Sequence, residues 1–318
     1  MEPPKRIAIV GAGAMGHGLA VHCARYGLDV TLIDHRESNL DRAAEQMLAV
    51  SEFLNEHELI DRSPDQLLDS IRSTTDRAAG VTDADLVLET ITEDLDAKRE
   101  LFAALVGEAP ESASLASNTS GIPISDIAAG APEAADRIVG CHWWYPPYLL
   151  EPVEVVRGEE SGDEHVARVA AFVESVGRRP IRVERDVPGF VWNRIQFAIF
   201  RECLHLVETG VASAEDVNAA IRDGYAVRTA AIGPFETMDL AGLDLVATVG
   251  ERLYPELAND EEPQATLTDR VAKGMTGLEV GEGIFEYEES PEAVTARRDR
   301  TVAAIRDAVH RERNVERS

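Results

Sequence analysis

The sequence predicts an α/β domain with a mainly parallel sheet, followed by an all-α domain. Short apolar runs rich in β-branched residues alternate with amphipathic helical patterns in the first part of the chain, which is typical of parallel strands joined by crossover helices. After Asp186 only helical periodicity remains. The chain of 318 residues is also longer than one ordinary hydrophobic core requires. We therefore expect two domains, residues 1–186 and 187–318.

Strands of the first domain are predicted where short apolar runs have high β propensity. They are Arg6–Val10, Val30–Ile33, Leu86–Ile91, Ser114–Ser117, Arg137–Cys141, Val153–Val156 and Pro180–Val183. The intervening periodicity predicts helices at Gly16–Tyr26, Leu40–Leu54, Asp94–Val106 and Glu164–Ser175. Gly27 follows the first helix, where glycine is favoured because it adopts positive φ without strain.

The second domain is expected to be helical throughout. Its helices are predicted at Gly189–Thr209, Ala214–Asp223, Pro234–Leu257 and Glu292–Arg311, with a loop at Asn259–Gln264. The stretch VWNRIQFAIFRECLHLV is apolar on more than one face of its helix. Such a helix is typically buried, so we expect it to lie between domains or between subunits.

Composition limits the classes of partner. The formal net charge is −27, and Lys5, Lys98 and Lys273 are the only lysines among 31 basic residues. Nucleic acid is not expected as a partner because phosphate binding requires clustered positive charge. The acidity fits a surface adapted to high salt, as in halophile proteins, better than a surface that repels anionic partners generally.

Cysteine usage and hydropathy indicate the compartment. Three cysteines, an odd number, lie far apart in apolar surroundings, which favours reduced thiols. They lack zinc-ligand spacing, and no metal is expected. No signal peptide or apolar run of about 18 residues is found, so no membrane span is expected. We therefore expect a cytoplasmic protein.

A glycine-rich turn follows the first predicted strand. The stretch GAGAMG places Gly11, Gly13 and Gly16 in G-x-G-x-x-G spacing at the start of a helix, with Ala14 and Met15 between the last two glycines. This spacing allows a tight turn, close approach of a pyrophosphate, and packing of the helix on the strand. Asp34 ends the second strand, where a carboxylate binds ribose hydroxyls and repels a 2′-phosphate. We expect a Rossmann-like domain that binds NAD rather than NADP.

The segment CHWWYPPYLLEPVEVV suggests the catalytic chemistry. His142 follows a predicted strand, and ligands of parallel sheets bind outside the carboxyl ends of strands. A neutral imidazole is suited to accept a hydroxyl proton, and Glu154 would hold its other nitrogen. The alternatives are a satisfied core or loop histidine and a glutamate that faces water. Cys141 is expected to be a small buried side chain rather than a nucleophile.

The order of motifs resembles the 3-hydroxyacyl-CoA dehydrogenase family over nearly the whole chain. The motifs are GAGAMG with Asp34, ETITEDLDAKRELF, SNTSG, the His142–Val156 segment, VPGFVWNR and GPFETMDLAGLD. The resemblance implies NAD as cofactor, His142 and Glu154 as the catalytic pair, and a homodimer formed through the second domain.

The same resemblance assigns further roles. It implies that Ser120 and Asn193 hold the substrate oxygen and that Glu93 and Lys98 line the cofactor site. The alternatives are ordinary structural roles: Ser120 in a turn, Asn193 on helix backbone groups, and Glu93 with Lys98 as an exposed helix pair.

The chain departs from the family in ways that bear on the substrate. Tyr145 stands where the family usually has asparagine, and lysines expected near the coenzyme A phosphates are missing, with only Arg62 in FLNEHELIDRSPDQLL. We expect oxidation of a 3-hydroxyacyl-CoA, such as 3-hydroxybutyryl-CoA. The alternative substrate is a free 3-hydroxy acid or a cationic hydroxy acid, for which Trp143, Trp144 and Tyr145 would shape a compact pocket or stack on the cation.

Two other functions are alternatives. Hydroxyisobutyrate-type dehydrogenases share a similar glycine-rich start but use a lysine in the interdomain helix, and Gly189–Thr209 contains none. A nucleotide-binding protein without turnover is the other alternative, and it would not need His142 and Glu154 together.

Overall fold

The computed structural model describes residues 2–315, with side chains through residue 311. By contacts the chain divides into two compact units between Arg194 and Ile195. The domain boundary near Asp186 stays a prediction.

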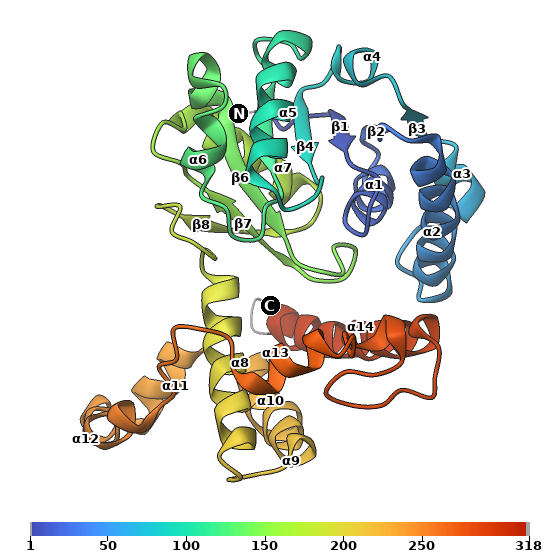
Figure 1. Ribbon diagram of the computed structural model, residues 1–318. Helices are drawn as coiled ribbons and strands as arrows, with labels where there is room; N and C mark the ends of the chain where they lie inside the picture. The colour runs from blue at the N-terminus through green and yellow to red at the C-terminus, as the bar shows by residue number, and fades with distance from the viewer. Residues whose placement is uncertain (1, 316–318) are drawn as a thin grey trace. The chain divides into compact units, whose positions relative to one another are not determined.

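The first unit is built on one eight-stranded sheet with the order β3-β2-β1-β4-β5-β6-β7-β8 (Figure 1). Neighbouring strands are parallel except for β6 and β7, which form an antiparallel pair. The fold class expected from the sequence is therefore confirmed. The strands are β1 (Arg6–Val10), β2 (Asp29–Ile33), β3 (Ile71–Thr74), β4 (Leu86–Glu89), β5 (Ser114–Ser117), β6 (Ile138–Trp143), β7 (Pro152–Val156) and β8 (Arg179–Val183).

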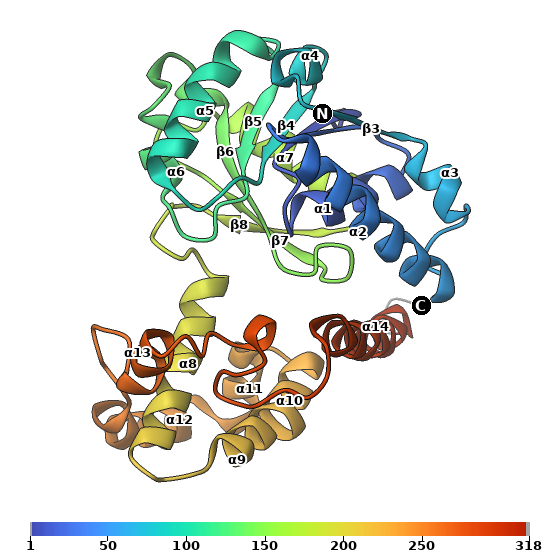
Figure 2. The same cartoon turned by 45° about the vertical axis from the view of Figure 1, so that its right-hand side comes forward.

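Helices cover both faces of this sheet (Figures 1 and 2). On one face lie α1 (Gly16–Arg25) and α7 (Asp163–Ser175), and the ring of Trp143 on β6 meets aromatic rings from both. Outside α1 pack α2 (Glu37–Glu56) and α3 (Pro64–Leu68). The other face carries α4 (Arg77–Val81), α5 (Leu95–Glu108), α6 (Ile124–Ala128) and the short helix η1 (Pro132–Arg137). The central strands β1, β2, β4, β6 and β7 are thus buried on both sides over most of their length, which explains their mainly apolar sequence.

The chain leaves the carboxyl ends of β1, β2, β4 and β5 at Gly11, Asp34, Thr90 and Asn118. Because these strands are parallel, the four positions share one edge of the sheet. The end of β6 and the start of β7 lie at the same edge, since β7 runs back along β6. This edge is where ligands bind in open parallel sheets.

The second unit is mainly helical in the described residues, with two isolated β-bridges at Gly277–Glu282 and Glu282–Glu286 (Figure 2). The helices are α8 (Trp192–Glu208, which begins in the first unit), α9 (Ala214–Ala219), η2 (Ala220–Tyr225), α10 (Ala226–Ala231), α11 (Pro234–Ala241), α12 (Leu243–Leu253), η3 (Tyr254–Glu256), α13 (Ala265–Ala272), η4 (Leu278–Val280) and α14 (Pro291–Val315). No residue of α8 is buried within this chain. In residues 2–315 no helix is long and apolar enough to cross a membrane.

Several element predictions need correction. The edge strand β3 was not expected, because its residues IRST are partly exposed and lack an apolar run. The single helix expected at Pro234–Leu257 is broken at Gly242, whose φ of 91° ends α11. Strand β6 continues to Trp143, so His142 lies in the strand and not in the loop beyond it.

Candidate active site

The glycine-rich turn has the geometry that a dinucleotide requires. Gly11 has a φ of 111°, and a Cβ on it would come within 2.7 Å of the Thr90 carbonyl oxygen. A Cβ on Gly16 would lie only 1.8 Å from the Gly11 oxygen, so α1 packs directly on the turn. Around Gly13 no atom lies within 4 Å of such a Cβ. The turn is therefore closed on its protein side and open at Gly13, where a pyrophosphate would approach.

Asp34 fastens the end of β2 to this turn. One of its carboxylate oxygens accepts a hydrogen bond from the Ala12 N–H at 3.0 Å. The other accepts from the Arg36 N–H at 3.0 Å and from the Asn39 side chain at 2.8 Å. Burial alone would raise the pKa of Asp34, but these hydrogen bonds outweigh it and leave the pKa below its ordinary value. The charge that would select a ribose hydroxyl over a phosphate is thus retained.

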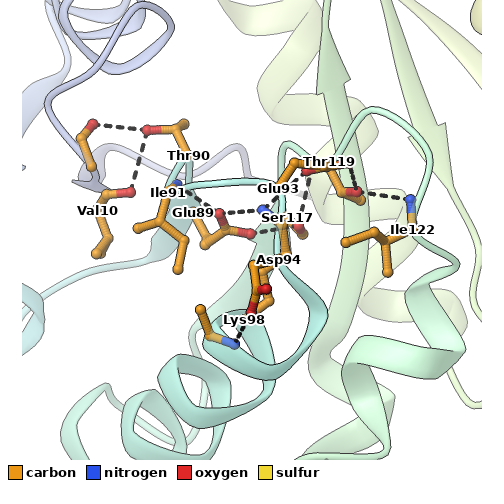
Figure 3. A network of polar contacts seen from close by, with 12 residues as sticks. Val10, Glu89, Thr90, Ile91, Glu93, Asp94, Lys98, Ser117, Thr119 and Ile122 are labelled. Atoms are coloured by element: carbon orange, nitrogen blue, oxygen red, sulfur yellow. Dashed lines mark hydrogen bonds and ion pairs between the residues drawn. The ribbon is translucent and has the colours of Figure 1, made fainter. Parts of the chain in front are cut away.

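A buried ion pair lies beneath the ends of β4 and β5. Lys98 donates to Glu89 at 2.7 Å, and the two side chains are 1% and 0% exposed. Glu89 also accepts from the Ser117 hydroxyl at 2.6 Å and from the Ile91 N–H at 2.7 Å (Figure 3). Burial raises the pKa of Glu89 despite these donors. The alternative of an exposed Glu93–Lys98 pair is therefore wrong, because Lys98 is buried and forms its ion pair with Glu89. No role was expected for Glu89 from the sequence.

Glu93 organises the loop after β5. Its Oε1 accepts from the Thr119 hydroxyl at 2.6 Å and from the N–H groups of Ser120 and Gly121 at 2.8 and 3.2 Å. Its other oxygen lies 3.5 Å from Lys98. The Ser120 carbonyl in turn accepts from the Asn193 side chain at 2.5 Å. The structure thus brings Ser120 and Asn193 together, with Glu93 holding the loop that carries Ser120.

His142 and Glu154 are direct cross-strand partners on β6 and β7. Their side chains project from the same face of the sheet, and His142 Nδ1 lies 2.6 Å from Glu154 Oε2. His142 is 5% exposed and Glu154 is 0% exposed. Within the described residues, this carboxylate is the only hydrogen-bond partner of the imidazole ring. Nδ1–H therefore donates to Glu154, and Nε2 is the ring atom left to accept a proton.

Glu154 is held by more donors than the sequence indicated. Its Oε1 accepts from the N–H groups of Val191 and Trp192 at 2.8 and 2.9 Å, at the start of α8. Its Oε2 accepts from the indole of Trp144 at 3.3 Å as well as from His142. Burial would raise the pKa of Glu154, but the bonds from His142, Trp192 and Val191 lower it overall. The carboxylate is therefore ionised at neutral pH and cannot be a glutamate that faces water.

The neighbouring aromatic residues have different surroundings. Trp143 is 2% exposed and packs in the core, so it does not shape a substrate pocket. Trp144 stacks on Trp192 with centroids 4.0 Å apart, and Tyr145 is 46% exposed. Cys141 is buried, and burial raises the pKa of its thiol to about 12, in agreement with the expected inert role.

Family models match the chain almost throughout. The model described as 3-hydroxyacyl-CoA dehydrogenase, NAD binding domain, matches residues 6–187, and the corresponding C-terminal domain model matches residues 189–287.

The chain is also similar to proteins named as dehydrogenases. It is 35% identical to 5-formyl-3-hydroxy-2-methylpyridine 4-carboxylate 5-dehydrogenase of Mesorhizobium japonicum, over 95% of this chain and 97% of that one. It is 37% identical to L-carnitine dehydrogenase of Streptomyces griseus (76% and 71% covered) and 31% identical to mitochondrial hydroxyacyl-coenzyme A dehydrogenase of Homo sapiens (89% and 91% covered). A crystal structure of the pyridine carboxylate dehydrogenase, described as an NAD+ dependent dismutase, superposes with a TM-score of 0.90 at 33% identity, over 96% of this chain and 98% of that one.

Proposed function

Because this chain belongs to the 3-hydroxyacyl-CoA dehydrogenase family, we propose that His142 is its catalytic base and Glu154 the acid that orients it. The chain is an NAD-dependent oxidoreductase that acts on a small molecule. The observation that carries the proposal is the buried 2.6 Å contact between His142 Nδ1 and Glu154 Oε2. A nucleotide-binding protein without turnover has no need of this contact.

The proposed chemistry divides between protein and cofactor. When bound at the glycine-rich turn, NAD supplies the acceptor for the hydride that leaves the hydroxyl-bearing carbon. His142 Nε2 takes the hydroxyl proton, and the carbon–oxygen bond becomes a carbonyl. Glu154 stabilises the imidazolium that forms, as the carboxylate of a catalytic triad does. Ser120 and Asn193 hold the substrate oxygen, and Glu93 and Lys98 support the loop beside the cofactor.

For the substrate we favour a free hydroxy acid over the coenzyme A thioester. A coenzyme A ester carries several phosphate charges, and the segment expected to meet them is acidic. Residues 37–68, which form α2 and α3, offer Arg42 and Arg62 against Glu37, Asp41, Glu45, Glu52, Glu56, Glu58, Asp61 and Asp65. Phosphate binding to such a surface is unfavourable at low salt. The similarity to enzymes named for a pyridine carboxylate and for carnitine supports the same choice.

The thioester remains the competing candidate, because the spacing of His142, Glu154, Ser120 and Asn193 matches the family motifs. The two candidates are distinguished by measuring kcat/KM for 3-hydroxybutyryl-CoA, free 3-hydroxybutyrate and L-carnitine at low and molar salt. We expect one of the free acids to have a higher kcat/KM than the thioester at both salt concentrations. A higher kcat/KM for the thioester at low salt would overturn the choice.

Charge reversal on α2 sharpens this test. Glu52→Lys and Glu56→Lys replace exposed carboxylates of this helix. If the free acid is the substrate, these variants leave its kcat/KM unchanged and do not make the thioester the better substrate. The matched control is Glu100→Lys, at an exposed position of α5 on the other face of the sheet.

We also propose that the second unit forms a homodimer in the cytoplasm. Its helices expose large apolar side chains, including Phe197 (63%), Phe235 (78%), Leu240 (77%) and Leu243 (61%). Apolar exposure on this scale is typical of a surface covered by a partner. Light scattering should give the mass of a dimer, and Phe235→Glu should shift it toward the monomer. A monomeric parent protein at micromolar concentration would contradict the proposal.

A further inference from the structure

Trp144 contacts the carboxylate of the proposed catalytic pair. Its indole N–H donates to Glu154 Oε2 at 3.3 Å, the same oxygen that accepts from His142 at 2.6 Å. Its ring stacks on Trp192 with an interplanar angle of 21°. Trp192 in turn donates its backbone N–H to Glu154 Oε1 at 2.9 Å. The two stacked tryptophans therefore hold both oxygens of one buried carboxylate.

Sharing Oε2 between two donors has an electrostatic consequence. Each hydrogen bond partly offsets the negative charge on Oε2. The bond from Trp144 therefore weakens the bond from His142, and the reverse is also true. Glu154 is 0% exposed and Trp144 is partly buried, so water screens this competition less than it would at the surface. In residues 2–311, the ion pair between His142 and Glu154 is the only one that either side chain makes within 4.0 Å. The indole N–H is thus the closest polar competitor of the imidazole.

We propose that Trp144 is a positioning residue that limits how strongly Glu154 stabilises the protonated form of His142. The proposal rests on the assignment of His142 as the base. In the oxidation direction the base must be neutral before it accepts a proton. By weakening the acceptor, Trp144 keeps His142 neutral to a lower pH and extends activity on the acid side. The stack on Trp192 fixes the indole in the orientation that makes this possible.

The test removes the donor and keeps the ring. Trp144→Phe retains an aromatic ring that can stack on Trp192 but lacks the N–H. In the pH profile of kcat/KM, we expect the acid limb to move to higher pH by about half a unit to one unit. This shift corresponds to the free energy of one hydrogen bond from a neutral donor. Trp144→Tyr serves as a second substitution without an indole N–H. A contact that is only structural would lower stability and leave the limb in place.

Trp143→Phe is the matched control. It also removes an indole N–H, but that group points to the Cys141 sulfur at 3.2 Å and not to the carboxylate. We expect this variant to lose stability, because Trp143 is 2% exposed, and to keep the acid limb of the parent enzyme.

A second measurement separates this inference from the proposed function. The midpoint of the His142 ring titration, followed by NMR in the free protein, needs no substrate and should rise in Trp144→Phe by the same amount as the limb. If it rises while the activity profile does not change, the coupling is supported and the role of His142 as base is wrong. If it stays constant or falls in both Trp144 variants, the inference is overturned.

Discussion

Replacing Glu154 by glutamine tests the arrangement of the catalytic pair most directly. The amide keeps one carbonyl oxygen and replaces the other oxygen by NH2. The carbonyl oxygen would keep the two N–H groups at the start of α8, at 2.8 and 2.9 Å. The NH2 group would then lie 2.6 Å from His142 Nδ1. Two donors cannot share that contact, so the imidazole must carry its proton on Nε2, the atom proposed to accept the substrate proton.

The magnitude follows from this change of tautomer. In serine proteases the corresponding change of an aspartate to asparagine lowers kcat by about 10⁴-fold, and we expect a loss of about 10² to 10⁴-fold here. The indole N–H of Trp144 also loses its acceptor, and a buried donor without a partner costs about 1–3 kcal/mol of unfolding free energy. NADH affinity should change little, because the glycine-rich turn and Asp34 do not contact Glu154.

The assay combines turnover, binding and stability. Turnover is followed by NADH absorbance, NADH affinity by quenching of tryptophan fluorescence, and stability by denaturant unfolding. Glu160→Gln, at an exposed position of the same unit, is the control and should match the parent in all three. If the Glu154→Gln variant turns over at the parent rate, or loses NADH affinity while kcat is unchanged, the orienting role is refuted.

Further expectations concern the base, the cofactor, the thiols and acid stability. His142→Ala should lower kcat by about 10² to 10⁴-fold with NADH affinity retained; unchanged turnover would reject the base. Asp34 should make kcat/KM for NAD exceed that for NADP by at least about 10²-fold, because like charges repel; equal use would contradict this. At pH 8, alkylation followed by mass spectrometry should label Cys203 before Cys141, whose thiol has a pKa of about 12. Folding lowers the pKa of Glu154, so its ionisation stabilises the folded state above its ordinary pKa of about 4.3, and this stabilisation is lost as the pH falls through the pKa of the folded state. In Glu154→Gln, the free energy of unfolding should lack this pH-dependent contribution.

The elements predicted correctly from the sequence are those whose apolar or glycine pattern matches their burial and contacts in the fold. Strands β1 and β4 are short, mainly apolar runs buried on both faces, and close contacts require glycine at positions 11 and 16 of the first turn, as the G-x-G-x-x-G spacing implies. Strand β3 was missed because an edge strand with polar side chains lacks that signal.

The sequence indicated several residues of the candidate site but not the contacts that join them. The spacing of His142 and Glu154 indicated a pair, yet the register that makes them cross-strand neighbours depends on the antiparallel turn between β6 and β7. The resemblance placed Lys98 beside the cofactor, with an exposed pair with Glu93 as the alternative, and neither indicated its buried partner Glu89, which lies on a strand nine residues earlier. The one available signal was Glu89 itself, a charge that closes the otherwise apolar run LVLE.

Glu154 accepts the first two N–H groups of the chain segment that begins α8, and this affects how the protein can be divided. A fragment that stops near Asp186 would include the glycine-rich turn, Asp34 and the buried Glu89–Lys98 pair, but it would leave one oxygen of a buried carboxylate without donors. Fragment design for binding studies or crystallisation should therefore extend to Arg194, so that the amides of Val191 and Trp192 accompany the nucleotide-binding unit.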